Sequence, residues 1–133
     1  MSSTPLTQAQ ILILKAAEDE NVLQKDDLSE SILGFHAQQA VEKLMKALLS
    51  QLSVPFELTH SLERLDRLLV ANHENLPATP VTLIDLTDFA VVYRYDLLFQ
   101  TIMPAPTDLI ETVRLIREHV VARIAALSSK TLA

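Results

Sequence analysis

Apolar residues recur at intervals of three and four along most of the chain, which is the spacing of an amphipathic α-helix. This periodicity predicts five helices, over residues 5–23, 28–52, 62–71, 80–99 and 108–128. Because most of the connections between them are short, neighbouring helices are expected to pack antiparallel. The sequence therefore predicts an all-α fold, an antiparallel up-and-down bundle of four to five helices, in one domain over residues 1–133.

Capping residues and prolines indicate where these helices begin. Thr4-Pro5 and Thr79-Pro80 each combine a hydroxyl N-cap with a proline at the first helical position. Residues 27–30 have the capping-box form, with Asp27 at the cap and a Glu three residues later. Thr59 or Ser61 is expected to cap the third helix. Thr107 is expected to cap the last helix, and the tail after Ser128 to fray.

The composition then excludes several kinds of protein. The chain has one Gly and no Cys, which excludes a glycine-rich phosphate loop, a disulfide, a zinc–thiolate site and a cysteine nucleophile. No run of about 18 apolar residues predicts a membrane span, and residues 1–5 lack the pattern of a signal peptide. A net charge of −6 argues against binding of bulk nucleic acid, which needs a basic field. We expect a cytoplasmic protein without a cofactor, in which Glu18 to Glu20 form a solvated acidic patch.

The stretch from Gly34 to Leu49 carries most of the candidate chemistry. On a helical wheel its apolar residues form one broad arc, which includes the amide of Gln38. Its polar residues are neighbours on the opposite arc: His36, Gln39, Glu42, Lys43 and Lys46. This polar arc is either a solvated face or one wall of a ligand-binding groove. Ile32 and Phe35 extend the same arc and favour a partner over bulk water. His36 has no metal-ligand partner at i+4, so no metal site is predicted.

The predicted helix over residues 80–99 adds a second set of candidates. Arg94 falls on its core-facing arc, where a guanidinium keeps its charge and needs a carboxylate, several carbonyls or an anionic ligand. Phe89, Val92 and Phe99 lie on the opposite arc and are expected to be exposed in a monomer. Two faces therefore compete as a homodimer interface, one with Ile32 and Phe35 and one with these three residues.

Three motifs resemble the HEPN family (higher eukaryotes and prokaryotes nucleotide-binding). Residues 35–49, FHAQQAVEKLMKALL, are similar to the signature helix of the family. Residues 59–62, THSL, resemble the start of its third helix, and residues 86–95, LTDFAVVYRY, resemble its Leu-Thr-x-[Tyr/Phe]-Ala-Val-x-x-Arg-Tyr segment. The resemblance implies a small helical bundle that dimerises and is often encoded beside a minimal nucleotidyltransferase, as a toxin–antitoxin pair or as a substrate-binding subunit. It also implies a nucleotide as a ligand.

Together the polar arc and the resemblance give one set of predicted ligand- or partner-binding residues: His36, Gln39, Glu42, Lys43, Lys46, His60, Arg94 and Tyr95. For His60 the alternative is an ordinary turn residue at a helix start. For Glu42 and Lys46 the alternative is a surface ion pair one helical turn apart.

The sequence departs from the family's ribonuclease members, which pair an Arg with a His four to six residues later. No His follows Arg94 at that distance, and Arg114-x4-His119 matches only in spacing, since residues five apart lie about 140° apart on a helix. The first expectation is therefore a non-catalytic binding module that partners a nucleotidyltransferase. A metal-independent ribonuclease toxin and a helical dimer without a small ligand are the alternatives.

Overall fold

The computed structural model describes residues 5–91 and 104–131, and within them every regular element is a helix. The order is α1 (Gln8–Val22), α2 (Glu30–Gln51), α3 (Leu62–Ala71), α4 (Leu83–Thr87), a 3₁₀ helix η1 (Asp88–Val91) and α6 (Pro106–Thr131). This confirms the prediction of an all-α helical bundle. The second half of the helix predicted over residues 80–99 lies outside the described residues, and so do Val92, Arg94, Tyr95 and Phe99.

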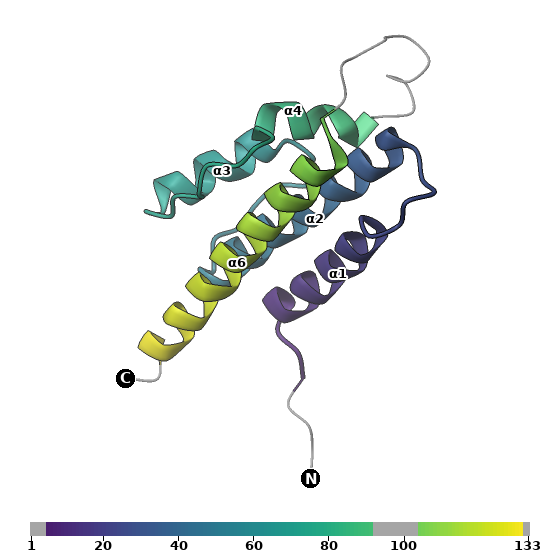
Figure 1. Cartoon of the computed structure of the whole chain (residues 1–133). Coiled ribbons are helices and arrows are strands. Elements are labelled where there is room, and N and C mark those ends of the chain that lie inside the picture. The colour runs from purple at the N-terminus through teal and green to yellow at the C-terminus, as the bar shows by residue number, and fades with distance from the viewer. Residues whose placement is uncertain (1–4, 92–103, 132–133) are drawn as a thin grey trace.

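The central helix is α2, which packs against α1, α3, α4, η1 and α6. In Figure 1, α1 runs opposite to α2, whereas α6 lies along α2 in the same direction. Near their C-terminal ends, Gln51 of α2 donates a hydrogen bond of 3.4 Å to Ser128 of α6. The residues of α2 that are fully buried in this core are Ala37, Ala40, Val41, Leu44, Met45, Ala47, Leu48 and Leu49. They are the apolar arc that the periodicity predicts.

Within the described residues four helices begin at hydroxyl caps, and three of these caps differ from the predicted positions. Thr7, and not Thr4, caps α1 through a capping box with Gln10. Ser29, and not Asp27, caps α2. In both cases a hydroxyl two or three residues downstream reaches the free N–H groups of the first turn. Ser61 caps α3, one of the two predicted alternatives.

The segment after Thr79-Pro80 forms less helix than predicted. Thr82 caps α4, which therefore begins three residues after Pro80, and the chain becomes a 3₁₀ helix at Asp88. The last helix begins at Pro106 and continues to Thr131, so the expected cap at Thr107 is wrong, whereas the expected fraying after Ser128 stays a prediction. Proline suits this first helical position, because its missing N–H would have no partner there.

Phe89 belongs to the core, and the expectation that it is exposed is wrong. Its side chain is 7% exposed, and its ring packs against Gly34 in α2. A Cβ on Gly34 would lie 2.6 Å from Cε1 and 2.8 Å from Cγ of this ring. The glycine inside α2 is thus explained by a close approach of η1, which an alanine would obstruct.

Candidate functional site

The polar arc of α2 forms a row of side chains that are neither solvated nor fully buried. His36, Gln39, Lys43 and Lys46, here called the α2 row, are all partly exposed, whereas Glu42 is 4% exposed. Three side chains of the row contact one of two buried carboxylates, one from α1 and one from α2 itself. The prediction that these residues are neighbours is confirmed, and the reading of the arc as a simple solvated face is wrong.

The first carboxylate belongs to Asp19 in α1, which is 7% exposed. Its Oδ1 lies 2.8 Å from Nδ1 of His36, and its Oδ2 accepts a hydrogen bond of 2.5 Å from Nζ of Lys43. Phe35 places the edge of its ring against His36, with centroids 5.3 Å apart. These three polar residues, the Asp19 cluster, join α1 to α2.

The prediction that residues 18–20 form a solvated acidic patch is therefore wrong for two of the three residues. Asp19 is buried, and Glu20 pairs with Arg117 of α6 at 3.0 Å. Only Glu18 behaves as predicted, in an exposed pair with Lys15 at 3.7 Å. A signal was present in the sequence, since Asp19 follows the buried Ala9 and Ala16 at helical spacing and so shares their face.

The second carboxylate is that of Glu42. Its Oε1 lies 3.0 Å from Nε2 of Gln38 and 2.9 Å from Nδ1 of His60, and its Oε2 accepts from Nζ of Lys46 at 3.0 Å. Gln38 also donates to the backbone carbonyl of His60 at 3.2 Å. Gln38, Glu42, Lys46 and His60 are called the Glu42 cluster. It fixes the loop before α3 on α2 and supplies the partners that the buried amide of Gln38 requires.

Gln39 and Phe56 extend the Glu42 cluster. Gln39 donates to Oε1 of Gln38 at 2.7 Å, so the amides and Glu42 form a continuous chain of hydrogen bonds. The ring of Phe56 lies 5.8 Å from Nζ of Lys46, within cation–π range. The sequence does not predict the contact with Phe56, because this residue lies in a loop and helical spacing does not place it beside α2.

The environment of Glu42 affects its ionisation. Burial on its own would raise the pKa of this carboxyl. The hydrogen bonds from His60, Lys46 and Gln38, with the positive charge of Lys46, outweigh burial, so the pKa of Glu42 lies below its ordinary value. Glu42 is therefore a carboxylate at neutral pH.

The two clusters follow the same scheme. In each, one carboxylate oxygen contacts an imidazole Nδ1 and the other accepts from a lysine. The acids lie underneath, while the side chains of Lys43 and His36 are 27% and 28% exposed and that of His60 is 70% exposed. Each lysine above these acids gives one N–H to a carboxylate and keeps two further N–H groups that can donate elsewhere.

The spacing match Arg114-x4-His119 does not bring these two side chains together. Arg114 contacts Glu111 at 2.5 Å and Glu118 at 2.9 Å, and these carboxylates hold the pKa of its guanidinium above its ordinary value. Nε2 of His119 is buried and has no hydrogen-bond partner among the described residues. The guanidinium and the imidazole therefore belong to different environments on α6.

Six of the eight predicted site residues lie in these clusters or contact them, and Arg94 and Tyr95 lie outside the described residues. Ile32 and Phe35 are partly buried, and their contact with a second copy stays a prediction. Within residues 5–91 and 104–131 no three His, Cys, Asp or Glu side chains gather in a way that would hold a metal ion. Over the same residues no helix is both long enough and apolar enough to span a membrane.

Comparison with known proteins gives one match. The model of the HEPN domain family matches residues 12–124, from the first turns of α1 to the last turns of α6. No curated protein matches the chain, and no solved structure does.

Proposed function

The chain belongs to the HEPN family, and from that premise we propose that it is a non-catalytic binding module. It binds a nucleotide, or the substrate of a minimal nucleotidyltransferase, along the α2 row and acts as the accessory subunit of that enzyme. The observation that carries this proposal is the pair of buried carboxylates beneath the row, each holding one imidazole and one lysine in place.

Fixed donors suit an acceptor-rich ligand. A lysine that gives one hydrogen to a buried acid keeps two further N–H groups to donate. Because Asp19 and Glu42 lie below, the ligand meets these donors without meeting the acids. Phosphate oxygens accept several such hydrogen bonds at once. Preordering by the acids also lowers the side-chain entropy lost on binding.

The arrangement of Arg114 and His119 supports a module without catalysis. An arginine shared by two carboxylates is a poor anchor for the phosphate of an RNA, and a buried Nε2 cannot exchange a proton with a substrate. The nucleotidyltransferase as partner is supported only by the resemblance of residues 35–49 to the family's signature helix.

Titration of the purified protein with ATP, followed by calorimetry, tests the ligand. Lys46→Met keeps a long unbranched side chain but removes the ammonium group, and we expect it to weaken ATP binding by about tenfold. The matched control is Lys15→Met, which removes an exposed lysine from α1. Equal affinity of both variants, or no heat of binding for the wild type, would contradict the nucleotide site.

Two further assays address the partner and the alternatives. Recovery of a nucleotidyltransferase in stoichiometric amount with the tagged full chain, from its own cells, supports the accessory subunit. Cleavage of transfer RNA by the wild type, with loss of cleavage in His119→Ala, would instead identify a ribonuclease. A protein with neither ligand nor enzymatic partner would be a helical scaffold.

A further inference from the structure

The carboxylate beneath His36 decides which ring nitrogen carries the hydrogen. An ionised carboxylate only accepts hydrogen bonds, so a ring nitrogen that contacts its oxygen must be the donor. At His36 this nitrogen is Nδ1, which lies 2.8 Å from Oδ1 of Asp19. In the neutral ring the other nitrogen, Nε2, then keeps its lone pair. Nε2 of His36 is therefore a nucleophile and not a hydrogen-bond donor.

The lone pair of this nitrogen is also accessible. The side chain of His36 is 28% exposed. Its Nε2 accepts no hydrogen bond from any residue that the structure describes, and it is not buried in the way that Nε2 of His119 is. The contact with Asp19 and the edge of the Phe35 ring hold the plane of the imidazole. The nucleophile thus faces the solvent in a fixed orientation.

The neighbours of the imidazole suit the transfer of an anionic group to it. When Nε2 forms a bond, the ring gains positive charge, which the carboxylate of Asp19 offsets from its place 7% exposed beneath the ring. The other oxygen of Asp19 holds Nζ of Lys43. This ammonium group keeps two N–H groups, and its charge attracts the oxygens of a phosphoryl group.

His60 rests on Glu42 in a similar way but has weaker support. Its Nδ1 lies 2.9 Å from Oε1 of Glu42, and its side chain is 70% exposed. Water competes for a contact that is so exposed, which reduces the effect of the acid on the ring. The better shielded dyad is that of Asp19 and His36, and the site is assigned there.

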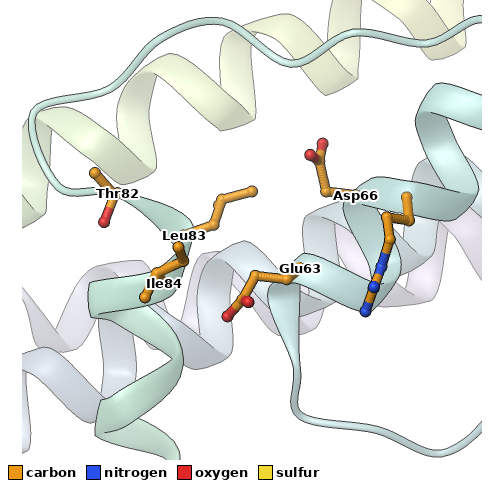
Figure 2. Close-up of a pocket in the computed structure, with 6 residues that line it drawn as sticks. Glu63, Asp66, Thr82, Leu83 and Ile84 are labelled. Carbon is orange, nitrogen blue, oxygen red and sulfur yellow. The ribbon is translucent and has the colours of Figure 1, made fainter.

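The cleft beside α3 shows that acids alone do not make such a site. Figure 2 shows Glu63 and Asp66 on one wall of this cleft of about 470 Å³, and Thr82, Leu83 and Ile84 on the opposite wall. No histidine of the described residues lines it. Burial alone raises the pKa of Asp66 above its ordinary value, so no donor stabilises this carboxylate. The cleft therefore holds acids without an imidazole nucleophile.

We propose that His36 is a phosphorylation site, at which Nε2 takes a phosphoryl group from a phosphoramidate, the chemical class that includes a phosphohistidine of another protein. The lone pair of Nε2 forms a bond to phosphorus, and the bond from phosphorus to the donor nitrogen breaks. The donor nitrogen is protonated beforehand and leaves with the bonding electron pair as a neutral amine. The hydrogen on Nδ1 stays at Asp19, which acts as a positioning residue. The step needs neither the nucleotide nor the nucleotidyltransferase, so it goes beyond the proposed function.

Nitrogen-15 NMR of the imidazole rings in the full chain tests the tautomer without a reagent. We expect the neutral ring of His36 to carry its hydrogen on Nδ1. A neutral ring with the hydrogen on Nε2 would overturn the proposal, because that nitrogen would have no lone pair to attack phosphorus.

Incubation of the full chain with potassium phosphoramidate, followed by mass spectrometry of its peptides under alkaline conditions, measures the reaction itself. His73 is the internal reference, because it is exposed and no hydrogen bond or ion pair joins its ring to a side chain that the structure describes. His36 is expected to gain the phosphoryl group about tenfold faster than His73. Asp19→Asn favours the wrong tautomer and is expected to slow the reaction at His36 by about tenfold or more, with His73 unchanged.

Controls separate this role of Asp19 from a loss of structure. His36→Gln should lose the label at residue 36 and keep that at His73, and circular dichroism checks that each variant is folded. Equal rates at His36 and His73, or no label at His36, would overturn the proposal. An Asp19→Asn variant with an unchanged rate at His36, or with both rates lowered alike, would do so as well. The wild-type ratio of rates and the tautomer decide the matter even if Asp19→Asn does not fold.

Discussion

The Asp19 cluster and the Glu42 cluster use the same chemistry to join different parts of the bundle. In the Asp19 cluster the acid comes from α1, and both of its partners come from α2. In the Glu42 cluster the acid, Lys46 and Gln38 all come from α2, and only His60 comes from elsewhere. The first cluster therefore links two helices, whereas the second mainly orders one helix and holds a loop against it.

The partners of Asp19 and those of Glu42 also differ in how exposed they are to water. The side chain of Lys46 is 13% exposed, whereas that of Lys43 is 27% exposed. Lys43 and His36 are the more exposed partners, Lys46 is less exposed, and the amide of Gln38 is fully buried. We conclude that Glu42 matters more for global stability, and that Asp19 matters more for the attachment of α1.

The largest effect is expected for Glu42→Ala, which removes the carboxylate acceptor of the Lys46 ammonium group and of one N–H of the Gln38 amide. Loss of one partner from a buried ion pair should lower the free energy of unfolding by about 3 kcal/mol or more. Urea unfolding at neutral pH measures this loss. Glu18→Ala, which breaks the exposed pair with Lys15, is the control and should change stability by less than about 0.5 kcal/mol. If both variants lost a similar amount of unfolding free energy, the buried pair would not stabilise the fold more than the exposed one.

A smaller and more local effect is expected for Asp19→Ala. The unfolding free energy should fall by about 2 kcal/mol, because Lys43 and His36 are partly hydrated after the change. Hydrogen exchange of the amides should accelerate in α1 more than in α6. Acceleration spread evenly over both helices would contradict a link between α1 and α2.

Acid titration tests the contribution of Glu42 to stability. The pKa of Glu42 is lower in the folded chain than its ordinary value of 4.5. The carboxylate therefore contributes stability above that value, and this contribution is lost as the pH falls through the folded pKa. Glu42→Gln should flatten the fall of stability between about pH 5 and pH 3. Glu63→Gln serves as the control, and identical slopes in the two variants would exclude Glu42 as a source of acid sensitivity.

The smallest effects are expected from the two imidazoles. His60→Ala should cost about 0.5 kcal/mol, because this side chain is mostly in water. His36→Ala should cost about 1.5 kcal/mol, since it removes a more buried hydrogen bond and the ring contact with Phe35. Thermal unfolding of the two variants measures the difference. A larger loss for His60 would reverse the proposed order.

Periodicity predicts the helices because burial of an apolar face decides them, and this holds for α2 almost to the residue. The sequence also predicts that Gln38 needs hydrogen-bond partners and that the residues of the α2 row are neighbours. It does not identify Asp19 as the acid beneath His36 and Lys43, because a contact between two helices depends on their packing and not on local spacing. Asp19 shares the face of Ala16, and this is the only local sign of its burial.

The helix starts show a different limit. Several hydroxyls or acids precede α1, α2 and α4, and any of them satisfies the general preference for a cap. The choice of Ser29 over Asp27, or of Thr82 over Thr79, depends on where the preceding loop places the chain. The prediction that Phe89 lies on the outer face assumes a continuous α-helix, and the change to a 3₁₀ helix at Asp88 alters the direction of its side chain.

The contact between Gly34 and Phe89 has a kinetic consequence. A phenylalanine ring that turns by 180° about its axis sweeps through space that its neighbours occupy, so a closely packed ring turns only when they move apart. Here the ring of Phe89 occupies the space that a Cβ on residue 34 would need, so it is closely packed against Gly34. The rate at which the Phe89 ring flips therefore reports how often η1 and α2 move apart. NMR measures this rate from the exchange between the signals of the two edges of the ring.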